Sequence, residues 1–352
     1  MAVNTKRVFY VDHVAATNFL DILATRPDIR VDRLENNAAA PAAAAVLAAA
    51  HAFQIGSARD ELDVGFHAHA GLLARTPDLL LISTNGAGYD TIDLDDCTRA
   101  GVLVVNQAGG NKEAVAEHAL AMLLCLAKRI IETDRFMRRA DGIERNAYMG
   151  TELKDKTLGI VGLGHVGGRL AELCRALFNM RILAYDPYLS AEQIAAKGAT
   201  KSGLDEMLTQ ADFVSINCPR TAETMNLMNA RRFGLMQKHA YFVTTARGGI
   251  HDEAALEAAL AAKAIAGAGL DVWFKEPPLK DHPLMRFDNV LVSPHTAGVT
   301  RESRANIARI AAEQMLDILD GRAPSRVLNP AVWPAYAARF ERSFGFAPTA
   351  PA

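Results

Sequence analysis

Short apolar runs alternate along the chain with longer segments in which apolar residues recur every three or four positions. Short runs bounded by polar residues are typical of buried strands, and the longer spacing is typical of helices packed on a sheet. The first part of the chain has four predicted strands: Val8–Val11, Phe53–Ile55, Leu79–Ser83 and Val102–Val105. The helices predicted there are Ala15–Ala24, Pro41–His51, Thr91–Ala100 and Ala114–Arg129.

The alternation becomes regular after Lys154, where an apolar run begins at Thr157. Further strands are predicted at Ile182–Asp186, Phe213–Asn217, Ala240–Thr244, Ala268–Val272 and Val290–Ser293. A long helix, Arg301–Leu319, follows and ends at Gly321. Strands that alternate with helices in this way indicate parallel sheets covered by helices.

Two segments have less regular patterns. Ala38–Ala50 is low in complexity, but alanine is the best helix former and Pro41 suits a first helical turn, so an ordered helix is expected. The tail, Val332–Ala352, keeps its large apolar groups at Trp333, Tyr336, Phe340, Phe344 and Phe346. We expect this tail either to pack across a subunit or to lie loose.

Composition narrows the class of protein. The chain has 352 residues, half of them apolar, which is enough for two domains. A net charge of −2 and a pI near 6.6 argue against binding to nucleic acid or to an anionic membrane. Four scattered cysteines suggest reduced thiols, with no metal site. No signal peptide or membrane-spanning run is apparent, so we expect a soluble, cytoplasmic protein.

A glycine-rich motif follows the run that begins at Thr157. Gly162, Gly164 and Gly167 form G-x-G-x-x-G, and Asp186 lies about 20 residues further on, at the end of the next strand. Gly162 allows a tight turn, Gly164 lets the backbone approach a pyrophosphate, and Gly167 lets the helix pack close to the sheet. Asp186 can bind both ribose hydroxyls and would repel a 2′-phosphate, which favours NAD over NADP. The alternative is a glycine-rich turn in some other α/β protein.

These patterns predict an α/β protein with two doubly wound parallel-sheet domains. If the last helix returns to the first block, a Rossmann-type nucleotide domain is inserted into a flavodoxin-like substrate domain. We expect residues 1–110 to begin the substrate domain, 111–297 to form the NAD-binding domain, and 298–352 to supply the return helix and the tail. Ligand would lie in the cleft, opposite the carboxyl ends of the strands.

Three ionisable residues each follow a predicted strand in the second half: Arg247, Glu276 and His295. A histidine exchanges protons near neutral pH, and a neighbouring carboxylate favours its imidazolium form. An arginine presents a rigid fork that matches a carboxylate and can polarise a carbonyl. Together they could reduce a 2-oxo acid, with His295 giving a proton to the keto oxygen and Glu276 holding the histidine.

Each of the three residues also has a purely structural interpretation. His295 follows a proline and could be a loop or capping residue, and Glu276 precedes two prolines and could be a solvated turn charge. Arg247 lies between an alanine and two glycines, where a long cation suggests an anion nearby. Spacing alone does not show that the three converge.

Several motifs in the right order resemble the D-isomer-specific 2-hydroxyacid dehydrogenases over roughly residues 50 to 330. The matching segments are Asn85–Asp93, Val115–Leu120, the glycine motif with Asp186, Ala246–Gly249, Leu270–Pro277 and Pro294–His295. The resemblance implies that Arg247 binds substrate and that Glu276 and His295 form the family's acid/base pair.

The resemblance also implies where substrate and cofactor bind. The substrate carboxylate would be held by the backbone amides of one glycine-rich segment, which comprises Asn85, Gly86, Ala87 and Gly88. The cofactor would be contacted by the backbone of His165 and Val166 at the pyrophosphate, by Thr245 along its length, and by Asp271 at the nicotinamide carboxamide. Family members are usually dimers paired through the nucleotide domain, with Ala114–Arg129 near the hinge.

The substrate is less well defined than the reaction. The segments around Asn85 and Asn106 look most like the phosphoglycerate dehydrogenase-like branch, which makes D-3-phosphoglycerate and phosphohydroxypyruvate a candidate pair. In that branch an Arg-Ser pair commonly ends the strand found here at Phe53–Ile55, but Gly56 takes the arginine's place and Arg59 lies close by. We also expect no regulatory domain after the last helix. The predicted enzyme is therefore an NAD-dependent D-2-hydroxyacid dehydrogenase with its exact acid left open.

Two alternatives remain. Some relatives are dinucleotide-sensing co-repressors that bind short peptides, which would make this chain an NAD-controlled binding module. The same scaffold also supports formate- and phosphite-type dehydrogenases, although a His–Glu pair fits the proton transfer of an alcohol better.

Overall fold

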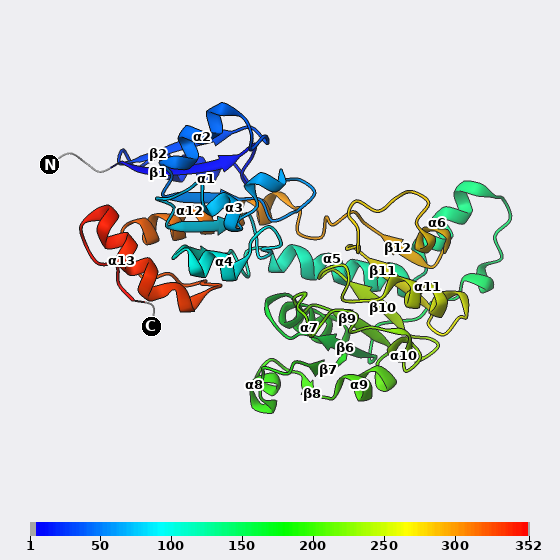
Figure 1. The fold of residues 1–352 in the computed structure, drawn as a ribbon. Coiled ribbons are helices and arrows are strands. Elements are labelled where there is room, and N and C mark those ends of the chain that lie inside the picture. The colour runs from blue at the N-terminus through cyan, green and yellow to red at the C-terminus, as the bar shows by residue number, and fades with distance from the viewer. Residues whose placement is uncertain (1–4, 351–352) are drawn as a thin grey trace. The chain divides into compact units, whose positions relative to one another are not determined.

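The computed structural model describes residues 5–350, which form two compact units, each built on a parallel sheet (Figure 1). One unit joins the residues up to Asn111 to those from Thr300 onward. The other unit is the continuous segment Lys112–Val299. The expected α/β fold with two parallel sheets is confirmed, and the first unit is made from two segments that are far apart in the sequence.

The first unit has a five-stranded sheet in the order β2-β1-β3-β4-β5, and its printed strand pairs are all parallel. This is the order of flavodoxin-like sheets. Its strands are β1 (Lys6–Val11), β2 (Ile29–Leu34), β3 (Ala52–Ile55), β4 (Leu81–Thr84) and β5 (Leu103–Val105). Its helices are α1 (Asn18–Ala24), α2 (Pro41–Ala48), α3 (Ala70–Leu73), α4 (Leu94–Arg99), α12 (Arg301–Leu319) and α13 (Trp333–Phe344).

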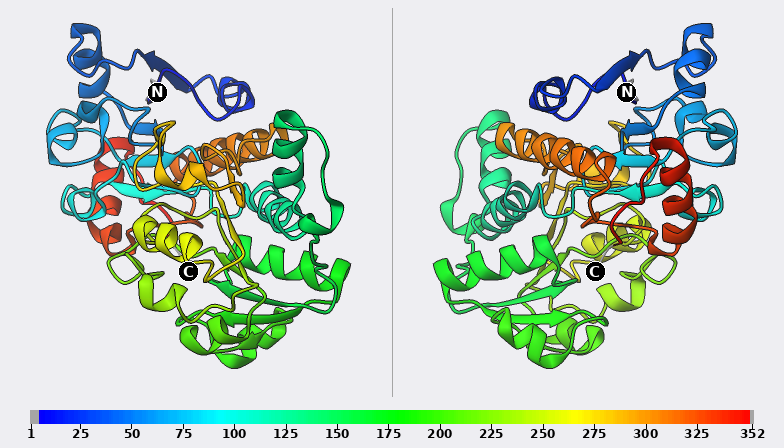
Figure 2. Two further views of the ribbon diagram at one scale, coloured as in Figure 1. Left: turned by 90° about the vertical axis from the view of Figure 1, so that its right-hand side faces the viewer. Right: turned by 90° about the vertical axis from the view of Figure 1, so that its left-hand side faces the viewer.

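Two apolar clusters cover the two faces of this sheet. On one face Phe53 packs with residues of α2, α3 and α4, including Leu47 of α2. On the other face Leu81 packs with residues of α1, α12 and α13, including Met315 of α12 and Tyr336 of α13. Figure 2 shows α12 in orange beside the strands of its own unit. The return segment is therefore one of the two layers that bury the sheet.

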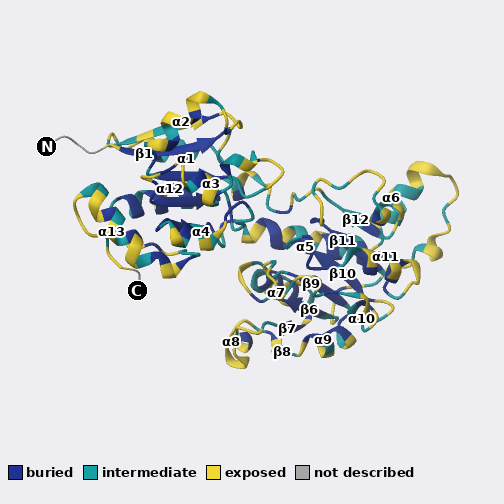
Figure 3. Cartoon of the chain, in the orientation of Figure 1, coloured by how far each residue is buried: buried dark blue, intermediate teal, exposed yellow. Residues whose placement is uncertain are grey.

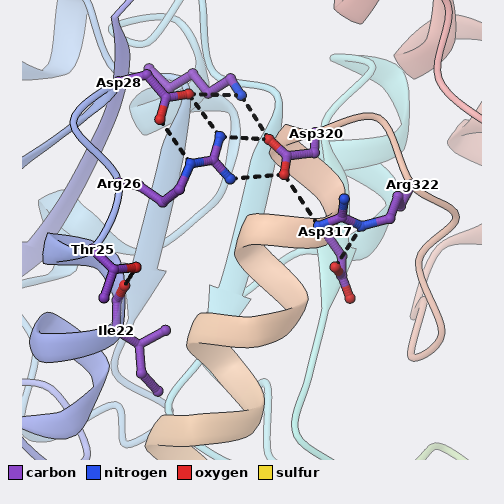
Figure 4. Close-up of polar contacts among 8 residues, drawn as sticks. Ile22, Thr25, Arg26, Asp28, Asp317, Asp320 and Arg322 are labelled. Atoms are coloured by element: carbon purple, nitrogen blue, oxygen red, sulfur yellow. Dashed lines mark hydrogen bonds and ion pairs between the residues drawn. The ribbon is translucent and has the colours of Figure 1, made fainter.

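An ion network joins the beginning of the chain to the end of α12 (Figure 4). The Arg26 guanidinium donates to both carboxylate oxygens of Asp320, at 2.8 Å each, and also to Asp28. The Lys6 ammonium lies 3.0 Å from Asp320 and 3.2 Å from Asp28. Arg322 completes the network from the other side of Asp320. The network thus ties together residues nearly 300 positions apart, since Arg26 and Asp320 are separated by 294 positions.

The second unit has a seven-stranded sheet in the order β12-β11-β10-β9-β6-β7-β8, again with parallel pairs. The strands are β6 (Thr157–Val161), β7 (Arg181–Tyr185), β8 (Thr200–Lys201), β9 (Phe213–Ile216), β10 (Tyr241–Thr244), β11 (Gly267–Leu270) and β12 (Val290–Val292). The helices are α5 (Lys112–Ala127), α6 (Ile130–Arg139), α7 (His165–Phe178), α8 (Ala191–Ala196), α9 (Leu204–Gln210), α10 (Ala230–Phe233) and α11 (Glu253–Ala261). From β6 the strands run outward in both directions, β7 and β8 to one side and β9 to β12 to the other, as in a Rossmann-type sheet.

The helices of this unit differ in burial. Residues of α5, α7 and α8 form the apolar cluster on one face of the sheet, and residues of α9, α10 and α11 form the cluster on the other. In contrast, α6 has no buried residue, and Figure 3 shows it in exposed and intermediate colours while the strands β9, β10 and β11 are dark blue. None of the helices between residues 5 and 350 combines the length and apolar character that crossing a bilayer needs.

The structure also corrects and extends the predicted elements. The helix expected within Ala38–Ala50 is confirmed and begins at Pro41. The expectation that the tail packs across a subunit or lies loose is wrong for α13, because Tyr336 and Phe340 are buried in the core of the chain's own first unit. Strand β2 was not predicted, because it lies at a sheet edge and carries charged residues between its apolar ones.

Candidate functional site

The parallel strands of the second unit bring most of the predicted site residues to one edge of the sheet. Gly162 follows β6, Asp186 follows β7, Thr245 follows β10, Asp271 follows β11, and His295 lies just beyond β12. Since neighbouring parallel strands end at the same edge, these five positions share it. The sheet therefore gathers residues that are up to 133 positions apart in the sequence, as the numbers of Gly162 and His295 show.

Two glycines of the motif are required by the chain itself. Gly162 has φ of +88°, and a Cβ there would lie 2.8 Å from the backbone nitrogen of Cys218. A Cβ on Gly167 would lie 2.1 Å from the carbonyl oxygen of Gly162. A side chain at either position would collide with backbone, so the turn from β6 into α7 needs both glycines.

The third glycine has a different environment. A Cβ on Gly164 would meet nothing within 4 Å, and Gly164 stands at the N-cap of α7 without a side-chain cap. The next N–H groups, on His165 and Val166, belong to the first turn of a helix and have no partner within it. This open, positively polarised helix end fits a pyrophosphate.

Asp186 and Thr245 lie on opposite sides of this helix end in the sheet order, Asp186 after the neighbouring strand β7 and Thr245 after β10, two strands from β6. The Asp186 carboxylate accepts hydrogen bonds from the backbone N–H of Leu163 and of Tyr188, both at 3.0 Å. These contacts fix the carboxylate next to the glycine turn. The Thr245 hydroxyl is buried, and within residues 5–350 it has no hydrogen-bond partner. A buried hydroxyl without a partner is costly, and a bound cofactor would supply one.

The structure brings His295 and Glu276 together. His295 Nδ1 lies 2.7 Å from Glu276 Oε2, and Glu276 Oε1 accepts the backbone N–H of Trp273 at 2.9 Å. Burial by itself would raise the pKa of Glu276. The hydrogen bond and charge of His295, with smaller contributions from Trp273 and Arg247, outweigh burial and lower that pKa. Glu276 is therefore an ionised hydrogen-bond acceptor at neutral pH.

Arg247 lies in the turn after β10, and its guanidinium donates to the carbonyl of Ala246 at 2.7 Å. Its charge contributes to lowering the pKa of Glu276, which places it within electrostatic range of the His295–Glu276 pair. The contact between His295 and Glu276 is direct, and the charge of Arg247 is the smallest of the contributions that lower the pKa of Glu276. Within residues 5–350 no group of three or more His, Cys, Asp or Glu side chains could hold a metal.

Asp271 is fully buried and organises the loop that carries His295. Its carboxylate accepts the backbone N–H of Thr296 at 2.8 Å, that of Ala297 at 2.9 Å, and the Ser293 hydroxyl at 2.6 Å. The Asp271 carbonyl accepts the His295 N–H at 2.7 Å. His295 has φ of +57°, which a residue with a side chain rarely adopts, so these bonds hold the histidine in an otherwise unfavourable conformation.

The sequence reasoning missed one further contact of this loop. His118, on α5, places Nε2 at 3.0 Å from the Ser293 hydroxyl, which in turn donates to Asp271. The segment Val115–Leu120 had been noted only for its resemblance, and nothing in its spacing pointed to Ser293. The only available signal was a histidine, beside Glu117, in a helix that is mostly apolar.

The first unit contains the segment expected to hold a carboxylate, just after β4. The Asn85 N–H donates to the carbonyl of Ile55 at 2.8 Å, and the Gly86 N–H donates to the Gln107 side chain at 3.1 Å. Within the described part of the chain, the N–H groups of Ala87 and Gly88 make no hydrogen bond. Two of the four predicted amides are therefore used by the fold, and two remain for an anion.

Comparisons with known proteins agree with this arrangement. A family model described as the NAD binding domain of D-isomer specific 2-hydroxyacid dehydrogenase matches residues 120–297. The D-3-phosphoglycerate dehydrogenase of Archaeoglobus fulgidus is 40% identical over 267 residues, which are 76% of this chain and 50% of that protein. The glyoxylate reductase of Aeropyrum pernix is 38% identical over 264 residues, which are 73% of this chain and 78% of that protein.

The fold is also similar to a solved structure, that of D-lactate dehydrogenase from Aquifex aeolicus complexed with NAD and lactic acid. The TM-score is 0.76 at 27% sequence identity, covering 89% of this chain and 96% of that one. This chain spans about half the length of the curated D-3-phosphoglycerate dehydrogenases that it matches.

Proposed function

The chain belongs to the D-isomer specific 2-hydroxyacid dehydrogenase family, and we propose that it interconverts a D-2-hydroxy acid and its 2-oxo acid with NAD. The observation that carries this proposal is the 2.7 Å contact between His295 and Glu276 at the sheet edge where the glycine turn also lies. The pair supplies a residue able to exchange a proton at the same sheet edge as the nucleotide-binding motif. Reduction of a ketone requires both a proton donor and a hydride-carrying cofactor.

The state of Glu276 determines which nitrogen of His295 reacts. An ionised carboxylate only accepts hydrogen bonds, so the proton between the two residues lies on Nδ1 of the histidine. Nε2 is then the nitrogen that gains and loses a proton. In the reducing direction, Nε2 donates to the keto oxygen of the substrate, and Glu276 stabilises the imidazolium before that transfer.

The remaining groups bind and orient. NADH, when bound, supplies the hydride. We assign Arg247 to the substrate, where its fork can pair with the carboxylate and polarise the carbonyl. In the first unit, we assign the N–H groups of Ala87 and Gly88 to a substrate carboxylate. The backbone of His165 and Val166 would hold the pyrophosphate, Thr245 would lie along the cofactor, and Asp271 would act on the nicotinamide side.

Asp186 supports a preference for NAD over NADP. Its carboxylate is fixed beside the glycine turn by two backbone N–H groups, where its charge would repel a 2′-phosphate. Asp186→Asn keeps the size of the side chain and removes the charge. We expect this variant to lose roughly tenfold or more of the discrimination against NADP, as the ratio of kcat/KM values for the two cofactors. An unchanged ratio would remove Asp186 from the ribose site.

The reaction can be tested with NADH and a panel of 2-oxo acids: glyoxylate, hydroxypyruvate, phosphohydroxypyruvate, pyruvate and aromatic analogues. We expect turnover of at least one and none with NAD and formate or phosphite. If NADH binds but no 2-oxo acid is reduced, the proposal is wrong, and binding of short peptides becomes the next measurement.

Arg59 provides a test for a phosphorylated substrate. Its Nε donates to the carbonyl of Asp90 at 2.5 Å, so the guanidinium is anchored to the segment that follows Gly88. If phosphohydroxypyruvate is the best substrate, Arg59→Ala should raise its KM about tenfold and leave the KM for glyoxylate unchanged. Equal effects on both would exclude Arg59 from a phosphate site.

A homodimer in the cytoplasm completes the proposal. Helix α6 has no buried residue and exposes Ile130 and Met137, and Met149 is exposed shortly after it. A second copy of the chain would cover this surface, and four free cysteines suit a reducing compartment. Sedimentation equilibrium of the wild type and of Met137→Asp tests the dimer, since a charge within the interface should shift the equilibrium to monomer. A wild-type monomer at micromolar concentration would contradict it.

A further inference from the structure

Gln107 is a fully buried side chain that the proposed function leaves without a role. It follows β5 by two positions and has no exposed surface. A buried amide is costly unless its donor and acceptor groups are satisfied. In this structure the partners that satisfy Gln107 come from the end of β4 and the loop beyond it.

The bonds of Gln107 hold the peptide groups on both sides of Gly86. Its Oε1 accepts the Gly86 N–H at 3.1 Å, and its backbone N–H donates to the Gly86 carbonyl at 3.0 Å. Its Nε2 donates to the Ser83 hydroxyl at 3.0 Å. The Thr84 hydroxyl donates to the same Gly86 carbonyl at 2.5 Å. Gly86 is thus fixed through both its N–H and its C=O, at φ of +144°.

The neighbouring residue fixes the next peptide in the same way. The Asn106 side chain donates from Nδ2 to the carbonyl of Ala87 at 2.9 Å. In a trans peptide the C=O and the following N–H point in opposite directions. Holding the Gly86 carbonyl therefore aims the Ala87 N–H, and holding the Ala87 carbonyl aims the Gly88 N–H. Both N–H groups are turned away from the donors that hold the carbonyls, which are the Gln107 backbone N–H and the Thr84 hydroxyl at Gly86 and the Asn106 side chain at Ala87.

We propose that Gln107 is a positioning residue that orients the N–H groups of Ala87 and Gly88 to receive the substrate carboxylate. This inference rests on the proposed function. Residues 87 and 88 are half-buried, and in the part of the chain that the structure describes their N–H groups have no acceptor. Two successive free N–H groups on a fixed backbone form an anion-binding concavity. Asn106 assists, but Gln107 holds the glycine on which the turn depends.

Kinetics of Gln107→Ala test the inference, with glyoxylate, or whichever 2-oxo acid the panel shows to be reduced, as the substrate. The variant removes the side-chain acceptor of the Gly86 N–H and the donor to the Ser83 hydroxyl, so the loop is held less firmly and its hydrogen bonds to the carboxylate weaken. We therefore expect the KM for the 2-oxo acid to rise about tenfold or more. The kcat should fall less than threefold and the KM for NADH should not change, because neither depends on this loop. A purely structural glutamine would lower the melting temperature and the active fraction but would leave KM unchanged.

Asn329→Ala is a matched control. Asn329 is a buried amide of the same unit that bonds to the backbone of Val102 and Val104, away from the loop. This variant should lower the melting temperature comparably and leave the KM for the 2-oxo acid unchanged. An equal rise of KM in both variants would overturn the assignment to Gln107.

Backbone amide exchange, measured by NMR on the full chain, separates this inference from the proposed function. In the wild type we expect slow exchange at Gly86 and fast exchange at Ala87 and Gly88. Oxalate, a dicarboxylate that is not reduced, should slow Ala87 and Gly88 in the wild type but not in Gln107→Ala. If no 2-oxo acid is turned over but oxalate gives this pattern, the proposed function fails and the positioning role stands. If oxalate leaves the wild-type loop unaffected, or protects it equally in Gln107→Ala, the positioning role is wrong.

Discussion

The Arg26–Asp320 network and the His295–Glu276 pair contain similar contacts with opposite consequences. In both, a nitrogen lies 2.7–2.8 Å from a carboxylate oxygen that is partly buried. Hydrogen bonds that Arg26 donates to Asp320 lower the pKa of that carboxyl far below its usual range, and the bonds that Arg26 donates to Asp320 and Asp28 raise the pKa of the guanidinium. Arg26 and Asp320 therefore both stay charged at neutral pH.

The pair in the second unit differs in its cation. An arginine does not release its proton in water, whereas a histidine exchanges one near neutral pH. The network can only hold two chain segments together, and the pair can transfer a proton. The identity of the nitrogen base, more than the distance, decides whether such a contact serves the fold or the reaction.

The largest expected effect comes from removing the exchangeable proton. His295→Ala should lower kcat about a thousandfold, the middle of the range for a general acid, while the Kd for NADH stays within about twofold. Stopped-flow kinetics and fluorescence titration measure the two quantities. His239→Ala is the control, because His239 lies 2.8 Å from Asp212 in an equally close pair on the surface. Equal losses of turnover and NADH binding would count against the acid/base role.

Acid should destabilise the second unit before it affects the network. His251 is buried beside Phe242, neither ring nitrogen has a partner within residues 5–350, and burial lowers its pKa to about 4. Between pH 6.5 and 4 the unfolded chain binds a proton that the folded chain does not. The free energy of unfolding therefore falls as pH falls, by at most ~3 kcal/mol from this residue.

Urea unfolding at several pH values measures this slope. In His251→Leu the slope between pH 6.5 and 4 should be smaller, and stability at pH 7 should not fall, since an unpaired buried polar group is removed. Asp320 and Asp28 lose their contribution only below about pH 4, because their pKa values are lowered from ordinary carboxyl values. An unchanged slope in the variant would assign the acid sensitivity elsewhere.

Breaking the network should affect stability and not catalysis. Asp320→Asn removes the charge that Lys6 and Arg26 share, and we expect the free energy of unfolding to fall by about 2 kcal/mol, between the values for exposed and buried pairs. Asp317→Asn at the same helix end removes an exposed pair with Arg322 and should cost under about 0.5 kcal/mol. A large fall in the kcat of Asp320→Asn at 25 °C would contradict the view that this network serves the fold and not the reaction.

The smallest expected effect comes from Glu276→Gln, which tests whether Glu276 only positions His295 or also acts on it through its charge. Glu276→Gln keeps a hydrogen-bond acceptor for His295 but removes the charge that stabilises the imidazolium. We expect kcat to fall about tenfold, and the alkaline limb of the pH–rate profile for 2-oxo acid reduction to move to lower pH. A profile that falls in height without moving would make Glu276 a positioning residue only.

Much of this molecule could be predicted because burial and backbone geometry leave local traces. The strands that end just before Asp186 and Asp271 are apolar runs, and α12 was predicted at Arg301–Leu319 as observed. Gly162 and Gly167 are recognisable because any side chain there would strike backbone. Such local signals were enough to predict which residues gather at one edge of the second unit's sheet, because parallel strands end at the same edge.

The remainder depends on partners that meet only after folding. Gln107 lies 21 positions from Gly86, and His118 lies 175 positions from Ser293, so no local pattern connects either pair. The same holds for the backbone N–H groups of Asn85–Gly88. The sequence suggested all four for a carboxylate, and in the structure two of them are already bonded within the fold. Helix α6 was not predicted because it buries nothing, and burial is what apolar spacing reports.

The discontinuity of the first unit has a consequence for synthesis on the ribosome. Leu81 and Val105 face a layer made of α1, α12 and α13, and the ribosome makes residues 112–299 before α12 and α13 exist. At ordinary translation rates this leaves an apolar sheet face only partly covered, by α1, for roughly 10–40 s, while the continuous second unit can already fold. Nascent chains stalled before residue 300 should therefore be cut by protease within their first hundred residues and bind chaperones there. Chains released after α12 should resist both.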